Sequence, residues 1–206
     1  MRTIVYIDGF NLYYGALKGS PWKWLDLEKL CRLLLPRDEI VLIRYFTSKV
    51  FATAGDLSGS ARQQVYLRAL RTLPSVRLHF GSFLSHVVSL PLASDPGRFV
   101  RVIKTQEKGT DVSLASHLLT DCFLRRCEAV VIVSNDSDLA ETVVLARREA
   151  QVVVGVINPR LESQSSRELA ADAIFVRQIK RRHLIAAQFP ITIYSAMGDI
   201  KKPGSW

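Results

Sequence analysis

Two hydrophobic patterns alternate along the chain and predict alternating strands and helices. Short apolar runs predict strands at residues 3–7, 40–46, 76–80, 129–133, 151–157 and 173–176. Apolar residues that recur every three or four positions predict helices at 25–35, 60–73, 110–123 and 137–148. Strands separated by helices indicate βαβ units, so the sequence predicts an α/β fold with a parallel sheet and helices on both faces.

Residues 81–105 interrupt this pattern, because glycines and prolines are spread through them. Within this segment we expect a small hairpin, with residues 86–90 paired against 99–103. Its apolar part at 83–92 has two interpretations. It is either a hairpin that packs on the protein's own core or a contact surface of a homo-oligomer, and the first is favoured.

Composition is typical of a globular protein. The 206 residues, 48% hydrophobic and 23% charged, are enough for one domain with a buried core. We place that domain at residues 1–180, with a C-terminal extension at 181–206 that packs on it or trails from it. No apolar run approaches the roughly 20 residues of a membrane span. The N-terminal MRTIVYIDG lacks the features of a secretory signal, so no membrane partner and a cytoplasmic location are expected.

The cysteines and histidines lack the spacing of metal ligands. Cys31, Cys122 and Cys127 form no C-x-x-C pair, so reduced, partly buried thiols are expected. The four histidines are scattered, which argues against zinc. The chain also lacks both glycine-rich phosphate-binding motifs, so nucleotide-motor and dinucleotide-binding functions are not expected.

The net charge of +9 favours a polyanionic partner, above all RNA, single-stranded or structured. The alternative is a basic protein whose charge serves only solubility. The run RQIKRR at 177–182 is one candidate for binding a nucleic-acid backbone, although such runs are more often solvated helix faces.

Four aspartates stand where the predicted elements meet one edge of the sheet. Asp8 ends the first strand, Asp136 and Asp138 follow the strand at 129–133, and Asp111 opens the helix at 110–123. Each alone could be an ordinary cap or turn residue. Together they would repel one another unless a cation compensates, and carboxylate oxygens are the ligands that Mg²⁺ and Mn²⁺ prefer. The sequence therefore predicts a shared cation site.

Several neighbours of these acids could contact a phosphate chain. Asn11 could orient a phosphate oxygen or a metal-bound water, or make only a local turn hydrogen bond. Lys108 could neutralise a phosphate or be solvated. Tyr13 and Tyr14 could stack a base, and at least one of them is expected in the core. The predicted substrate-binding residues are Asn11, Lys108, Tyr13, Ser134 and Asn135.

Other charged residues are expected to lie outside the site. Asp121 is ten residues beyond Asp111 on one helix, about 15 Å along the axis, and is predicted to be solvated. Glu141 either supports the site or lies on the surface, with the surface favoured. Arg147 and Arg148 close their helix and are explained by its dipole.

Three motifs resemble those of a known family. IDGFNLYYG, EKGTDVSLASHLL and VVIVSNDSDLAETV together resemble the NYN domain, a branch of the PIN-like nuclease superfamily, and bacterial stand-alone proteins of the LabA type in particular. The resemblance covers nearly the whole chain. It implies a PIN-like three-layer α/β/α sandwich with a central, mainly parallel sheet, and an acidic Mg²⁺ or Mn²⁺ pocket for RNA cleavage.

Carried over residue by residue, the resemblance makes Asp8, Asp111, Asp136 and Asp138 the catalytic and metal-binding acids. Asn135 stands where many relatives have glycine, and asparagine tolerates the same backbone conformation. The implied function is a metal-dependent (endo)ribonuclease, a hydrolase of phosphodiester bonds. A catalytically quiet RNA-binding or regulatory module is the alternative. A dehalogenase-like phosphatase is disfavoured, because it would need an acid at Phe10.

Overall fold

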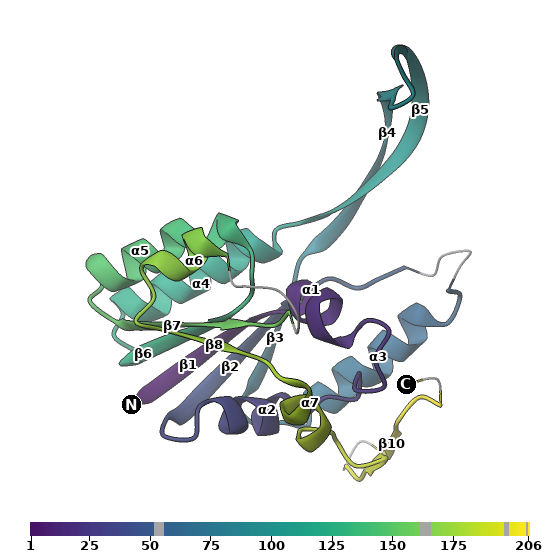
Figure 1. The fold of residues 1–206 in the computed structure, drawn as a ribbon. Helices are drawn as coiled ribbons and strands as arrows, with labels where there is room; N and C mark the ends of the chain where they lie inside the picture. The colour runs from purple at the N-terminus through teal and green to yellow at the C-terminus, as the bar shows by residue number, and fades with distance from the viewer. Residues whose placement is uncertain (52–55, 161–165, 196–197, 205) are drawn as a thin grey trace.

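The computed structural model describes residues 1–51, 56–160, 166–195, 198–204 and 206. Its centre is a six-stranded sheet in which every pairing is parallel (Figure 1). The strands, in spatial order, are β3 (Val76–Phe80), β2 (Glu39–Thr47), β1 (Arg2–Asp8), β6 (Ala129–Val133), β7 (Val153–Asn158) and β8 (Phe175–Gln178). The strand order reverses between β1 and β6, the kind of position at which α/β sheets bind ligands.

Helices cover both faces of the sheet, so the predicted α/β sandwich is confirmed (Figure 1). One face packs against α1 (Gly9–Leu12), α2 (Leu27–Leu34), α3 (Gly59–Leu70) and α7 (Arg181–Ala186). The other packs against α4 (Thr110–Phe123), α5 (Ala140–Arg148) and α6 (Arg167–Ala171). Side chains of β1 alternate between the two cores, with Val5 and Ile7 in the first and Ile4 and Tyr6 in the second.

The predicted element boundaries shift where the structure has local caps. Asp26 accepts a hydrogen bond from the Lys29 amide (3.0 Å), so α2 begins at Leu27 rather than at residue 25. The helix predicted at 137–148 opens with a short 3₁₀ turn, η2 (Ser137–Leu139), before α5. A short π-helical segment, η1 (Tyr13–Leu17), continues α1. The last predicted strand, β8, lies two residues later in the chain than expected.

The segment at 81–105 forms a long antiparallel hairpin of β4 (Ser82–Leu92) and β5 (Asp95–Lys108). The predicted pairing is confirmed, with Val87 opposite Ile103 and Leu90 opposite Val100. The expectation that this hairpin packs on the protein's own core is wrong. None of its residues is buried, and it extends away from the sheet (Figure 1). Its apolar side chains lie on both faces of the two-stranded ribbon, and near its base the Phe83 ring meets the Phe10 ring of α1 at 5.9 Å.

The prediction that Asp121 is a solvated helix residue is also wrong. Its side chain is fully buried under α4, where it accepts hydrogen bonds from Tyr6 (2.6 Å), Arg44 (2.8 Å) and Arg126 (2.9 Å). Burial alone would raise the pKa of Asp121, but the hydrogen bonds from Arg44, Tyr6 and Arg126 outweigh burial and lower it. This acid therefore connects α4 to the sheet.

Beyond residue 180 the chain packs on the first core. Leu184, Ala187, Phe189 and Ile200 are buried there, and β9 (Thr192–Ile193) pairs with β10 (Ile200–Lys201). The predicted boundary at residue 180 stays a prediction. The three cysteines are free and buried, and no helix in the described ranges has the length and apolarity that crossing a bilayer requires.

Candidate metal centre

The candidate site lies at the carboxyl ends of β1 and β6, where the strand order reverses. Asp8 is the last residue of β1, and its carboxylate caps α1 by accepting a hydrogen bond from the Asn11 amide (2.9 Å). Its other oxygen accepts a hydrogen bond from the Ser134 hydroxyl (3.0 Å), directly after β6. Burial raises the pKa of Asp8, and these hydrogen bonds partly offset that rise. Asp8 is thus held rigidly and points into the site.

The turn after β6 presents Asp136. Its amide donates to the Ser134 hydroxyl (3.1 Å), and its carboxylate accepts from the Asp138 amide (3.1 Å), which caps η2. Asn135 connects this turn to α1, since its amide donates a hydrogen bond to the Asn11 side chain (3.2 Å). Asp136 therefore caps η2, and the cap leaves its carboxylate on the lining of the same cavity as Asp8.

Asp111 reaches the same place from the first turn of α4. Gly109 precedes this helix with φ of 95°, a left-handed conformation that favours glycine. Partial burial raises the pKa of Asp111 to about 6, and the charges of Asp8 and Asp136 add to that rise. Three acids from separate elements thus share one small volume.

The ligand oxygens of Asp8, Asp111 and Asp136 lie within 4.8 Å of one another. Asp138 is exposed and does not belong to this group, although its charge contributes to raising the pKa of Asp111. An all-oxygen donor set with mutual repulsion fits a hard divalent cation such as Mg²⁺ or Mn²⁺. We call these three aspartates the acid triad. They line a cavity of about 270 Å³.

Glu107 is a fourth carboxylate in this cavity, and the sequence reasoning missed it. It accepts hydrogen bonds from the Ser48 hydroxyl (3.0 Å) and the Thr110 hydroxyl (2.6 Å). The signal was available: Glu107 stands three residues before Thr110, where an acid can satisfy the exposed amides of the first turn of α4. Glu107 also contributes to raising the pKa of Asp111.

Of the predicted substrate-binding residues, Asn11 lines the acid-triad cavity, whereas Lys108, Tyr13, Ser134 and Asn135 do not, and Ser134 is fully buried. Lys108 is exposed at the end of β5, and alternation along that strand directs Glu107 into the cavity instead. Tyr14 lines the cavity, and Tyr13 lines a neighbouring one. Both rings are exposed, by 63% and 36%, so the expectation that one of them is core is wrong.

A basic groove adjoins the acid triad. A cavity of about 970 Å³ is lined by Lys18, Arg160 and Arg181, and it shares Phe10, Asn11 and Tyr14 with the acid-triad cavity. The guanidinium of Arg181 lies 4.9 Å from the centre of the Trp22 ring. We call this cavity the basic groove.

The run at 177–182 is divided between two places. Arg181 lines the basic groove, whereas Arg177, Lys180 and Arg182 line a separate cavity beside α2.

Glu141 is exposed, and Arg147 and Arg148 pair with Asp172 away from the triad. Glu141, Arg147 and Arg148 do not line the acid-triad cavity, as the sequence predicted.

Comparison with known proteins agrees with this geometry. The model of the NYN domain family matches residues 2–177, which include all three acids of the triad. The chain belongs to the NYN domain family. A curated relative, 6-hydroxy-3-succinoylpyridine 3-monooxygenase HspA from Pseudomonas putida, is 32% identical over an alignment that covers all of this chain and 75% of that protein.

A solved structure supports the fold of this NYN protein. A protein of unknown function, VPA0982 from Vibrio parahaemolyticus, superposes with a TM-score of 0.56 at 15% sequence identity. The match covers 87% of this chain and 94% of the other. This likeness concerns the fold alone.

Proposed function

We propose that this NYN protein is a metal-dependent ribonuclease that hydrolyses phosphodiester bonds at the acid triad. The observation that carries the proposal is the convergence of Asp8, Asp111 and Asp136 within 4.8 Å at the switch point of the sheet. Structural caps alone do not require three carboxylates to converge, and their repulsion has a cost that a bound cation removes. The nuclease-like fold of the family agrees with this use.

In this proposal the triad would hold Mg²⁺ or Mn²⁺, and a bound ion of this kind polarises a phosphate and makes water more acidic. The protein's own part is positioning. The Asn11 amide and the Ser134 hydroxyl fix both oxygens of Asp8, so its orientation does not depend on the ligand. Raised pKa values at Asp8 and Asp111 mean that cation binding would displace protons from the site at low pH.

The basic groove supplies the complementary charge for an RNA strand. Lys18, Arg160 and Arg181 lie beside the acids, so phosphates flanking the cleaved one would contact cations while that phosphate lies at the triad. Tyr14, whose ring is 63% exposed, lines the same groove and offers a ring face to an unpaired base, whereas the Arg181 guanidinium already lies over the Trp22 ring. The basic groove would contact the RNA backbone, and an exposed ring face is available only to unpaired bases. Together they favour single-stranded RNA as the substrate.

Cleavage of end-labelled single-stranded RNA tests the proposal. Wild-type protein should give products with Mn²⁺ or Mg²⁺ and none with a chelator, and Asp136→Asn should reduce the rate by at least about 100-fold. Asp95→Asn is the matched control, because Asp95 lies at the turn between β4 and β5, and it should cut normally. Identical products from wild type and Asp136→Asn would refute the assignment. Binding without cleavage would identify the catalytically quiet RNA-binding module instead.

The 32% identity to HspA favours one second candidate, oxygenation of a heteroaromatic ring. That chemistry consumes O₂ and two electrons, so the test is O₂ uptake with 6-hydroxy-3-succinoylpyridine and a reduced nicotinamide or flavin. We rank it below the nuclease, because the triad offers only carboxylate oxygens. Non-haem iron oxygenases typically bind their metal through two histidines and one carboxylate.

A further inference from the structure

A second cavity, of about 300 Å³, opens beside the acid triad, and aromatic rings form a large part of its lining. It shares Phe10 and Tyr14 with the acid-triad cavity, so the two are neighbours. Its volume is at the lower end of the range of small-molecule sites, about 300–1,000 Å³. We call it the aromatic pocket. The rings that line it are Phe10, Tyr13, Tyr14, Tyr45, Phe51, Tyr66 and Trp206.

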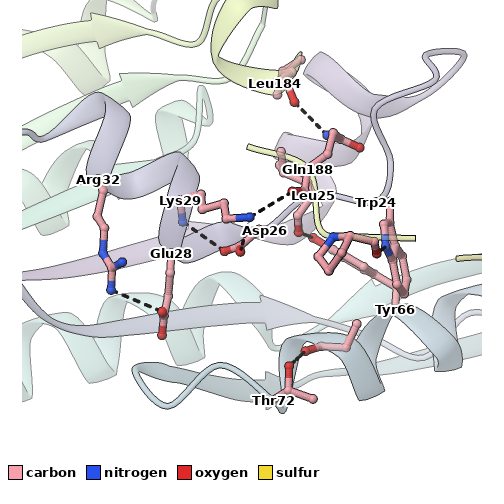
Figure 2. A network of polar contacts seen from close by, with 12 residues as sticks. Trp24, Leu25, Asp26, Glu28, Lys29, Arg32, Tyr66, Thr72, Leu184 and Gln188 are labelled. Carbon is pink, nitrogen blue, oxygen red and sulfur yellow. Dashed lines mark hydrogen bonds and ion pairs between the residues drawn. The ribbon is translucent and has the colours of Figure 1, made fainter. Parts of the chain in front are cut away.

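The inner wall of the aromatic pocket is fixed by hydrogen bonds. The Tyr66 hydroxyl donates to the Leu25 carbonyl (2.9 Å), a bond drawn in Figure 2. The Gln63 side chain is fixed at both ends, since it donates to the Ser48 carbonyl (2.9 Å) and accepts from the Val50 amide (2.9 Å). These wall residues are held in place by contacts within the protein, which lowers the cost of ordering them around a ligand.

Three rings of the aromatic pocket are exposed. Tyr13, Tyr14 and Phe51 are 36%, 63% and 67% exposed, and the Tyr13 and Tyr14 rings meet edge to face at 5.3 Å. Large exposed apolar groups gathered in one place mark binding surfaces. Aromatic faces beside a nuclease-like acid site are suited to stacking on a planar ring.

Tyr45 connects the aromatic pocket to the triad. A Cβ on Gly9 would lie only 2.7 Å from the Tyr45 ring, so the absence of a side chain lets this ring pack against the backbone next to Asp8. Burial raises the pKa of Tyr45, and the charge of Asp8 adds to the rise, which reflects the same proximity. A group in the pocket would therefore lie directly beside a group at the acids.

We propose that the aromatic pocket binds one nucleobase of the RNA strand whose adjacent phosphate lies at the acid triad. This inference rests on the proposed ribonuclease function and adds how the enzyme positions its substrate. A base inserted between exposed rings fixes the phosphate attached to it, so the pocket selects the bond that is cut.

Polar groups at the edge of the aromatic pocket would contact the edge of the base. Arg62 lines the pocket and pairs with Asp56, and Lys23 lines it as well. The guanidinium and the carboxylate together offer donors and acceptors in one place, which is what recognition of a base edge requires. An RNA base is a better fit than an aliphatic ligand, because both stacking faces and edge partners are present.

The test measures binding of eight-nucleotide RNAs in a chelator, so that no cleavage occurs. Each RNA carries one abasic nucleotide, at each position in turn, and affinity is read by fluorescence anisotropy. In wild type, one abasic position should weaken binding about 5- to 150-fold more than the others. In Phe51→Ala and Tyr13→Ala that extra loss should disappear, and intact RNA should bind as weakly as the abasic RNA binds wild type.

Matched variants separate recognition from folding. Phe123→Ala removes an aromatic ring of similar exposure (57%) at the far end of α4, and it should bind like wild type. Phe51→Tyr keeps the ring and should keep the extra loss of affinity at one abasic position, which we call the abasic penalty. Circular dichroism should show all variants folded, because the altered rings are exposed.

The outcomes are distinguishable from failure of the ribonuclease proposal. An abasic penalty that is equal at all positions, or that persists in Phe51→Ala, overturns the base pocket even if wild type cuts RNA. Absence of cleavage with a retained, Phe51-dependent penalty supports the base pocket while the hydrolase proposal fails. If 6-hydroxy-3-succinoylpyridine binds more tightly than RNA, and Phe51→Ala abolishes that binding, the inference is overturned in favour of a free heteroaromatic ligand.

Discussion

The Ser134 hydroxyl donates a 3.0 Å hydrogen bond to the carboxylate of Asp8, which joins the ends of the two central strands at the point where strand order reverses. The same hydroxyl accepts from the Asp136 amide (3.1 Å). One buried serine therefore positions two of the three acids of the triad.

Ser134→Ala tests this positioning role. Removing the hydroxyl leaves a buried oxygen of Asp8 without its partner, so we expect a loss of about 1–3 kcal/mol in the free energy of unfolding. Mn²⁺ affinity should fall about 10- to 100-fold, as for other groups that orient metal ligands. Calorimetric titration and chemical denaturation measure the two effects. Ser137→Ala, in the same turn but exposed, should change neither.

Asp111→Asn should stabilise the metal-free protein. Partial burial raises the pKa of Asp111 to about 6, and repulsion from Asp8 and Asp136 adds to the rise. A neutral amide removes both the desolvation cost and the repulsion. Discounted for partial exposure, the gain is about 1 kcal/mol, or about 3 °C in Tm. The rise in Tm that Mn²⁺ gives to wild type should be smaller in the variant, because one of the three carboxylates is lost. A Tm increase with Mn²⁺ equal to that of wild type would mean that Asp111 does not bind the ion.

Asp121→Asn should have the opposite effects: it should destabilise the protein and leave Mn²⁺ binding unchanged. It removes the charge that compensates the nearly buried Arg44 guanidinium, and breaking such a pair costs about 3–5 kcal/mol. Mn²⁺ affinity should stay at the wild-type value, because Asp121 is ten residues along α4 from Asp111, about 15 Å. Urea denaturation and Mn²⁺ titration of the same preparation measure stability and metal affinity, and so distinguish the structural role of Asp121 from the metal-binding role of Asp111. Equal stability of variant and wild type would contradict the structural role.

The His79 ring predicts an acid sensitivity that is independent of the triad. Burial lowers the pKa of His79 to about 4, with His117 and Arg44 adding to the effect and Asp121 opposing it. Between pH 6.5 and pH 4 the unfolded chain binds a proton here that the folded chain does not, so stability falls as pH falls. Wild type should lose about 1–2 kcal/mol more than His79→Gln between pH 7 and pH 4.5, after discounting for partial exposure.

Unfolding free energies at the two pH values measure this difference. His86→Gln is the control, because His86 is exposed on the hairpin, and it should follow wild type. Parallel losses in wild type and His79→Gln would show that the acid sensitivity has another origin.

Local patterns predicted the sheet and the acids because both depend on short stretches of sequence. The buried strand before Asp136 and the helix start beside Asp111 are visible from periodicity, and the parallel sheet then brings their ends together. The length of the hairpin was underestimated, and its apolar part at 83–92 was expected on the core because apolar residues are more often buried than exposed.

Side-chain direction and distant partners could not be predicted in the same way. Glu107 rather than Lys108 lines the site because β5 continues as far as Lys108, and the length of that strand was not evident from the sequence. Asp121 is buried because Arg44, 77 residues away, lies opposite it on β2. Such pairings require the three-dimensional arrangement.

Calorimetric titration of Mn²⁺ into wild type, Asp136→Asn and Asp95→Asn tests the central claim that the acid triad is a cation site. Wild type and Asp95→Asn should bind with equal affinity, and Asp136→Asn should bind at least about 10-fold more weakly, since one of three clustered carboxylates is lost. Equal Mn²⁺ affinity in all three proteins would contradict the claim.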